Sequence, residues 1–275
     1  MPIRLDEQVE AILNGLHQVL GETLMGAYLH GSSVLGGLKP RSDLDIIAVI
    51  ARRATLGEKR ESVELLMKGS GRVGSIGAPH PIEFDLVVES EIRPWRHPTL
   101  VDFHYDELIR EELEAGKIDL SNGVEERGFA PLVRMARSAG ASLYGPPPTT
   151  MFEPVPTADY HDAILKDIEE IDRWIIVDTR NVVLTLARVW AGLCTDDLHS
   201  KESCVSWALP RLSRAHRGVL ERALAIYRCE AEEYWDDVRP QVQAYAEFVV
   251  AEIKATPEYA TWLQGRYHQS SETPI

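Results

Sequence analysis

Two pairs of acidic residues, each separated by a single residue, are the part of this chain best suited to chemistry. Asp43 and Asp45 open the apolar segment DLDIIAVI, and Glu83 and Asp85 lie in the similar segment PIEFDLVVE. Side chains two positions apart on a strand point to the same face, so each pair converges. Converging carboxylates repel each other unless a cation lies between them. Oxygen donors with open positions suit Mg²⁺, which takes its other ligands from nucleotide phosphates and water.

Glu83 and Asp85 are both candidates for a general base. Glu83 is flanked by Ile82 and Phe84, and apolar surroundings raise the pKa of a carboxyl group toward the range of a useful base. The residues by themselves leave Asp85 as the rival.

A Gly-Ser pair lies ten residues before the first acidic pair. Gly31 and Ser32 follow a short apolar stretch and precede what we predict to be a short helix. A glycine there lets a phosphate approach the backbone, and free N–H groups at a helix start favour an anion. An isolated Asp-x-Asp usually marks a solvated strand end. The combination found here is more specific: it consists of Gly-Ser, a turn, Asp-x-Asp and then a carboxylate within the next strand. We interpret it as a site for a nucleotide and Mg²⁺.

The elements that must position these residues alternate between helices and strands. Periodicity predicts helices at 6–20, 54–68, 100–115 and 125–138, and strands at 25–30, 43–50 and 81–89. The segment 145–156 contains five prolines and is predicted to be a linker. Beyond it the predicted helices are 160–175, 181–193, 200–208, 213–229 and 236–255. We therefore expect an α/β or α+β domain at 1–150, a helical domain at 157–267, and a disordered tail at 268–275.

The composition of the chain limits which binding partners and which cellular compartment we expect. The 275 residues carry 43 acidic and 29 basic side chains, a net charge of −14, and a field of that sign repels nucleic acid and anionic membranes. Three widely spaced cysteines do not form a disulfide framework. Neither a secretory signal nor a membrane-spanning run is apparent. We expect a cytoplasmic protein and, because no exposed apolar stripe demands a partner, a monomer.

The segment His30–Ile50, HGSSVLGGLKPRSDLDIIAVI, resembles the G-S-x(10)-D-x-D signature of the nucleotidyltransferase superfamily that includes DNA polymerase β. Within it, the Gly-Gly-Leu-Lys-Pro-x-Ser-Asp run resembles the aminoglycoside adenylyltransferases that act on streptomycin and spectinomycin. VLTLARVW at 183–190 and the Ser200-Lys201 pair extend this resemblance over nearly the whole chain. It implies an α+β fold, in which a nucleotidyltransferase domain with a mixed sheet precedes an all-α helical bundle.

The resemblance also implies roles for the first-domain residues. Ser32, next to Gly31, would hold phosphate oxygens of ATP, and Ser42, the serine before the first aspartate, would assist. Asp43 and Asp45 would bind Mg²⁺. Glu83 takes the place of the family's catalytic base, beside the same metal, which resolves the rivalry with Asp85.

In the helical domain, the resemblance assigns Arg188, Lys201 and Tyr227 to the nucleotide and Asp178 to the drug. Without the resemblance, we would interpret Arg188 as a helix residue paired with an acid, Lys201 as an exposed lysine and Tyr227 as a core residue. The tryptophans of this half are expected in the bundle core. Two further patterns are set aside: 69–74 fits G-x-G-x-x-G but opens no predicted helix, and His97 and His104 lack the partners of a metal site.

The expected reaction is transfer of AMP from ATP to a hydroxyl group of an aminocyclitol or aminoglycoside. Asp178 and Asp85 would receive its ammonium groups. Relatives that handle streptomycin carry tryptophan at the position of Leu108 and an acid at that of Trp174, and Asn181 replaces a family histidine. These departures favour spectinomycin, modified at O-9, with weak or absent streptomycin transfer. The alternatives are a different small-molecule acceptor or a non-catalytic nucleotide-binding regulator.

Overall fold

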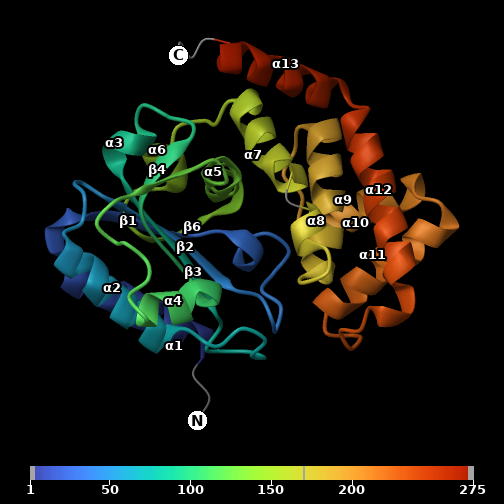
Figure 1. Ribbon diagram of the computed structural model, residues 1–275. Helices are drawn as coiled ribbons and strands as arrows, with labels where there is room; N and C mark the ends of the chain where they lie inside the picture. Colours follow the sequence, from blue (N-terminus) through green and yellow to red (C-terminus); the bar gives the residue numbers. More distant parts are fainter. Residues whose placement is uncertain (1–3, 170, 272–275) are drawn as a thin grey trace. The chain divides into compact units, whose positions relative to one another are not determined.

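A computed structural model of the chain describes residues 4–169 and 171–271 (Figure 1). The chain divides into two compact units, Met1–Val155 and Pro156–Ile275. The border lies at the end of the proline-rich segment 145–156. That segment is not wholly a linker, because it contains the short helix α6, Pro148–Met151, and Met151 packs into the core of the first unit.

The first unit is built on a six-stranded mixed sheet with the strand order β5-β4-β3-β2-β1-β6. The strands are β1 Leu24–Leu29, β2 Leu44–Ile50, β3 Ile82–Val88, β4 Thr99–Asp106, β5 Val124–Glu126 and β6 Ala141–Tyr144. β2 and β3 run parallel, and the other neighbouring strands are antiparallel. The predicted α+β class with a mixed sheet is confirmed.

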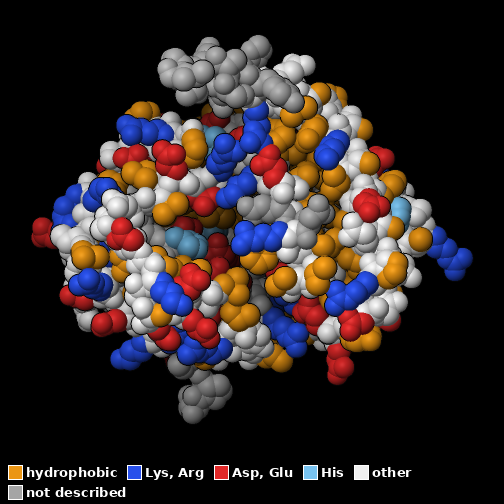
Figure 2. Space-filling model, in the orientation of Figure 1, with side chains coloured by type: hydrophobic (Ala, Val, Ile, Leu, Met, Phe, Trp, Pro, Cys, Tyr) orange, Lys and Arg blue, Asp and Glu red, His pale blue; other side chains and the backbone are white. Residues whose placement is uncertain are grey.

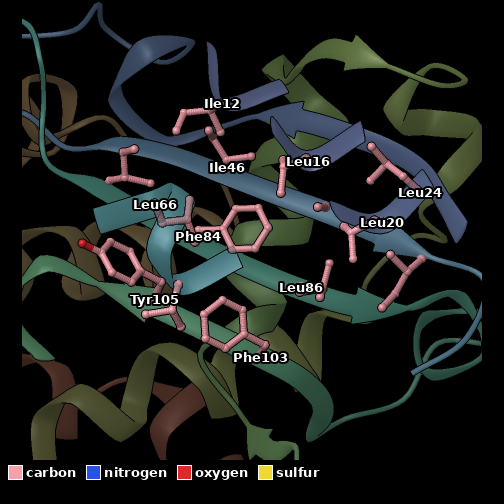
Figure 3. Packing of buried hydrophobic residues seen from close by; sticks show 14 of the residues in the cluster. Ile12, Leu16, Leu20, Leu24, Ile46, Leu66, Phe84, Leu86, Phe103 and Tyr105 are labelled. Atoms are coloured by element: carbon pink, nitrogen blue, oxygen red, sulfur yellow. The ribbon is translucent and has the colours of Figure 1, made fainter. Parts of the chain in front are cut away.

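Helices α1, Leu5–Leu20, and α2, Leu56–Gly69, cover one face of this sheet. Apolar residues at helical spacing on α1, such as Ile12, Leu16 and Leu20, pack against Ile46 and neighbouring strand residues (Figure 3). α2 begins at a capping box, in which the Thr55 hydroxyl accepts from the Glu58 amide. Both helices were predicted from this periodicity, within two residues at each end.

Helix α5, Phe129–Ala139, covers the opposite face. Ile47 and Val49 of β2 and Val87 of β3 pack there, whereas their neighbours along each strand face α1 and α2. This alternation also settles where the acidic residues lie. Asp45 and Glu83 share the α5 side of the sheet, at the end of the strands where β2 and β3 begin.

The helix predicted at 100–115 is wrong. Residues 99–106 form β4, and only the short 3₁₀ helix η3, Glu107–Ile109, and α4, Arg110–Glu114, are helical. Phe103 and Tyr105 alternate with polar residues and pack into the core beneath α1 and α2. The apolar residues therefore recur with the two-residue period of a strand and not with the period of a helix. The helix predicted at 125–138 likewise begins with β5 before α5, and β6 was not predicted.

The second unit is all-helical, as predicted. Its longer helices are α7 Thr157–Glu169, α9 Thr179–Thr195, α10 Lys201–Ala208, α11 Arg214–Tyr227, α12 Arg239–Lys254 and α13 Pro257–Ser271, with the short α8 at Ile171–Trp174. α9 packs against α10, α11 and α12, and its Trp190 is buried as expected. α13 continues through Ser271, so residues 268–271 are helical rather than a disordered tail. The rest of that predicted tail, 272–275, lies outside the described residues.

None of the helices in the described part of the chain combines the length and the apolar composition needed to cross a lipid bilayer.

Candidate active site

Asp45 and Glu83 lie directly opposite each other on the parallel strands β2 and β3. Both side chains are half-buried and point to the same face of the sheet. Asp43 is exposed and lies immediately before β2, two positions from Asp45. The structure therefore places Asp45 and Glu83 side by side at one end of the parallel pair, with Asp43 just before the start of β2.

Glu83 has the electrostatic environment of a carboxyl group that can accept a proton. Removal from water has the largest effect and raises the pKa of Glu83 well above its ordinary value. The negative charges of Asp45, Asp85 and Asp106 raise this pKa further, and His104 lowers it. A carboxylate held in this way is a stronger base than one in water.

His104 is a member of this cluster that the sequence interpretation missed. Its Nδ1 atom lies 2.8 Å from Oδ1 of Asp85, and the two residues are opposite each other on β4 and β3. Burial alone would lower the pKa of His104, but the hydrogen bond and charge of Asp85, with the charges of Glu83 and Asp106, raise it to about 9. The signal was present in the alternation of residues 102–106, which was assigned to a helix.

Gly31 lies against the Asp45 carboxylate. It has φ +65°, and a Cβ atom built on it would lie 1.8 Å from Oδ2 of Asp45. The amide of His30 donates to the carbonyl oxygen of Asp45 at 3.1 Å, which fixes the end of β1 beside β2. Ser32 follows in the short 3₁₀ helix η2, Gly31–Ser33, and is half-buried. A residue with a Cβ atom at position 31 would displace the Asp45 carboxylate from this position.

The carboxylate oxygens at this edge of the sheet are suitable ligands for Mg²⁺ that is bound together with a nucleotide. Among the described residues, no group of three or more His, Cys, Asp or Glu side chains could hold a metal ion unaided. Mg²⁺ is usually held by one or two carboxylates together with substrate phosphates and water rather than by a cage of protein ligands. Asp45 and Glu83, which lie opposite each other, are an all-oxygen pair that fits this pattern, and Asp43 lies at the same end of the strands.

A pocket of about 360 Å³ opens beside Glu83, Asp85 and His104, within the first unit. Its wall is mostly apolar and includes Phe103, Ile109, Ile118, Leu120, Val124 and Leu132. Space for a small molecule therefore adjoins the proposed base.

In the helical unit, four of the predicted binding residues form one connected group. Asn181 Nδ2 donates to Asp178 Oδ2 at 2.8 Å, and Lys201 Nζ donates to Asn181 Oδ1 at 3.3 Å. Lys201 Nζ also lies 5.1 Å from the centre of the Tyr227 ring, within the range of a cation–π contact. Arg188 lies two turns after Asn181 on α9 and is half-buried.

The two positions that we connected with streptomycin are both exposed. Leu108, in η3, is 73% exposed, and Trp174, in α8, is 40% exposed. The expectation that the tryptophans of this half lie in the core is therefore wrong for Trp174. Its carbonyl oxygen accepts from the amide of Asp178 at 2.8 Å, so it lies one helical turn from the acid predicted to contact the drug.

Comparison with known proteins points to one family. Residues 150–252 match the model of the aminoglycoside adenylyltransferase C-terminal domain. The chain is 31% identical over 253 residues to a spectinomycin 9-adenylyltransferase of Staphylococcus aureus, covering 92% of this chain and 96% of that one. It is 29% identical to an aminoglycoside (3'')(9) adenylyltransferase of Escherichia coli, over 90% and 94% of the two chains.

A solved structure agrees with these similarities. The crystal structure of spectinomycin adenyltransferase AAD(9) from Enterococcus faecialis with ATP and spectinomycin superposes with a TM-score of 0.84. The two sequences are 25% identical, and the match covers 90% of this chain and 99% of the other.

Proposed function

The chain belongs to the aminoglycoside adenylyltransferase family, whose members are ATP-dependent nucleotidyltransferases, and we propose that its acceptor is spectinomycin. The choice of spectinomycin is supported by similarity to spectinomycin enzymes over most of both sequences, and the transfer reaction by the register of Asp45 and Glu83 on β2 and β3. The resemblance predicts the O-9 hydroxyl as the acceptor atom.

Glu83 acts as the general base of the proposed reaction. The acceptor hydroxyl gives its proton to Glu83, and its oxygen forms a bond to the α-phosphorus of ATP as the bond to the bridging oxygen breaks. Pyrophosphate leaves with the electron pair of that bond. Burial raises the pKa of Glu83, and this supports the role, because a base works best when its pKa approaches the pH of the reaction.

Asp43, Asp45 and Glu83 are the proposed ligands of Mg²⁺. When bound, the ion would neutralise charge that develops on the triphosphate. Catalysis then consists mainly of positioning and electrostatic stabilisation. Gly31 contributes to the positioning, because its lack of a Cβ leaves room for the Asp45 carboxylate.

The remaining nucleotide contacts are proposed from the family resemblance. They comprise Ser32 and Ser42 in the first unit and Arg188, Lys201 and Tyr227 in the second. The contact between Lys201 and Tyr227 supports their joint role, since it holds a cation in place for an anionic ligand.

Asp178 is the proposed partner of an ammonium group of the acceptor, with Asn181 beside it. Asp85 is a weaker candidate than the sequence suggested, because its charge is compensated by His104. Leu108 and Trp174 supply neither the aromatic platform nor the acid found in relatives that handle streptomycin. We therefore propose weak or absent streptomycin transfer.

We further propose that the protein acts as a cytoplasmic monomer, without nucleic acid or a membrane as a partner. The net charge of −14 supports this, and Figure 2 shows Lys and Arg interspersed with Asp and Glu on the face in view. Sedimentation equilibrium tests the monomer, and a retardation assay at low salt tests nucleic acid binding.

The function is tested by incubating the protein with ATP, Mg²⁺ and either spectinomycin or streptomycin and weighing the products by mass spectrometry. An AMP adduct on spectinomycin alone is expected. Adducts on both drugs would overturn the specificity argument. Adducts on neither, with the protein folded, would overturn the proposed acceptor.

A further inference from the structure

Most of the glycine-rich segment 69–74 lies in a loop that contacts the segment around Asp43. This loop, 70–81, joins α2 to β3. We propose that it positions Asp43 for Mg²⁺ and ATP, and that His80 is the positioning residue through which it acts. The proposal rests on the proposed function, in which Asp43 holds the metal that accompanies ATP.

The two ends of the loop are held together by Gln8 of α1, which is 2% exposed. Its Nε2 donates to the carbonyl oxygens of Gly69 at 3.0 Å and His80 at 2.7 Å, and its Oε1 accepts from the His80 amide at 2.9 Å. The Gly71 amide donates to the same His80 carbonyl oxygen at 2.9 Å. A Cβ atom on Gly71 would lie 1.9 Å from the Pro79 carbonyl oxygen, so the two ends of the loop are too close for a side chain at position 71. The main chain of His80 is thereby fixed.

The His80 side chain reaches from this anchored point to the residue before Asp43. Its ring is buried, and Nδ1 lies 2.8 Å from the carbonyl oxygen of Ser42. A carbonyl oxygen only accepts hydrogen bonds, so Nδ1 carries the hydrogen and donates. Ser42 is itself held in a turn, because its amide donates to the Lys39 carbonyl and its Oγ accepts from the Lys39 amide.

Two further backbone hydrogen bonds restrain the chain on either side of Asp43. The Gly77 amide donates to the Pro40 carbonyl oxygen at 2.7 Å, and the Leu44 amide donates to the Pro81 carbonyl oxygen at 2.7 Å. Asp43 is exposed and precedes the regular ladder of β2, so these contacts restrain its backbone where the sheet does not.

Residues that orient a metal-binding group typically contribute about 10–100-fold to metal affinity. His80 occupies such a position for Asp43, although it touches neither the metal nor the nucleotide. It therefore should affect the affinity for the metal–nucleotide complex more than it affects the stability of the fold.

The test compares His80→Leu with His80→Asn. Leucine keeps a branched side chain of similar reach without a donor, whereas the amide nitrogen of asparagine takes the place of Nδ1 and restores the hydrogen bond. Tyr28→Phe is the matched control, because it removes a side-chain donor to the Pro146 carbonyl oxygen, 3.0 Å away in the same unit. Binding of Mn²⁺ with ATP is measured by electron paramagnetic resonance without an acceptor, and melting temperatures are measured in parallel.

The expected result is a loss of Mn²⁺·ATP affinity of about 10–100-fold in His80→Leu, with affinity close to wild type in His80→Asn and Tyr28→Phe. A folded His80→Leu protein that binds like the wild type would overturn the proposal. So would an asparagine variant as weak as the leucine variant.

If His80→Leu does not fold, His80→Gln decides the question, because its amide lies one bond too far to replace Nδ1. The proposal then requires weak binding in the glutamine variant and normal binding in the asparagine variant. Since no acceptor is present, these outcomes are independent of spectinomycin transfer, which the adduct measurement tests separately.

Discussion

The Nδ1 atom of His104 lies 2.8 Å from Oδ1 of Asp85, and this contact joins β4 to β3 two residues along from Glu83. With its pKa raised to about 9, His104 carries a positive charge at neutral pH in a cluster otherwise made of carboxylates. It also compensates Asp85, so that Glu83 is distinguished from its rival by environment as well as by its place in the family pattern. The two acids, alike in sequence, differ in the partners that the fold provides.

The first prediction concerns the pH dependence of this ion pair. The pKa of His104 in the folded protein is raised to about 9 from 6.5. Protonated His104 therefore stabilises the folded state fully below pH 6.5, and this contribution is lost as the pH rises through about 9. His104→Gln should lower the free energy of unfolding at pH 6 and lower it much less at pH 10, as measured by urea denaturation.

The NMR titration of the His104 ring provides the control. Asp85→Asn should bring its pKa down toward the ordinary value. Equal losses of stability in His104→Gln at both pH values would contradict the pairing.

The second prediction concerns the base. Glu83→Gln keeps the size and the oxygen atom of the side chain but cannot take a proton, so kcat for adenylyl transfer should fall by about 10²–10⁴-fold. Asp85→Asn should retain most of kcat, because Asp85 is already engaged by His104. Steady-state kinetics with spectinomycin and circular dichroism of both variants provide the measurement. A fully active Glu83→Gln enzyme would exclude Glu83 as the base.

The strands of the site were predictable because each is signalled by its own residues. β2 and β3 are continuous apolar runs in which acids occur at alternate positions near the start, so the convergence of Asp43 with Asp45, and of Glu83 with Asp85, follows from the geometry of the two strands. Their exact pairing did not follow, because register depends on both strands at once.

β4 was assigned to a helix although polar and apolar residues alternate over 102–106, which is the pattern of a strand. Its polar residues Asp102 and His104 have partners in distant parts of the chain. Asp102 accepts from the buried Nζ of Lys59 at 3.0 Å, and His104 reaches Asp85. Local sequence does not contain such partners, which arise only when the sheet assembles.

The third prediction concerns acceptor specificity. Leu108→Trp combined with Trp174→Asp should create measurable streptomycin transfer, because an aromatic platform and an acidic partner contribute about 1–3 kcal/mol each. Both positions are exposed, so the melting temperature should change little. Transfer to each drug is measured by mass spectrometry, with spectinomycin as the internal control. The absence of any gain in a folded double variant would refute the specificity argument.

The fourth prediction concerns Lys201. Its ammonium group is held by Asn181 Oδ1 and lies over the Tyr227 ring, so it is oriented before a ligand arrives. Lys201→Ala should raise the KM for ATP by roughly 10–100-fold, since hydrogen bonds to charged groups contribute about 1.5–3 kcal/mol. Lys254→Ala, in the last turn of α12, is the control and should leave the KM unchanged. An unaltered KM in Lys201→Ala would remove this residue from the proposed nucleotide site.

The fifth prediction separates backbone strain from a clash at the site. Gly31 and Gly21 both have positive φ, +65° and +53°, but a Cβ atom on Gly21 would meet nothing within 4 Å, whereas on Gly31 it would lie 1.8 Å from the Asp45 carboxylate. Alanine at either position costs about 1–2 kcal/mol of stability or more, because an L-residue is strained at positive φ, and Gly21 has ψ −133°, outside the left-handed helical region. Gly21→Ala should therefore melt at a lower temperature and remain active.

Gly31→Ala should show a similar loss of stability and, in addition, lose adenylyl transfer and Mn²⁺·ATP binding, because Asp45 must move to admit the methyl group. Thermal melting, kinetics and metal binding on the two variants provide the comparison. If Gly31→Ala bound Mn²⁺·ATP as well as Gly21→Ala does, the Asp45 carboxylate would not need its present position, and its proposed place among the metal ligands would have to be abandoned.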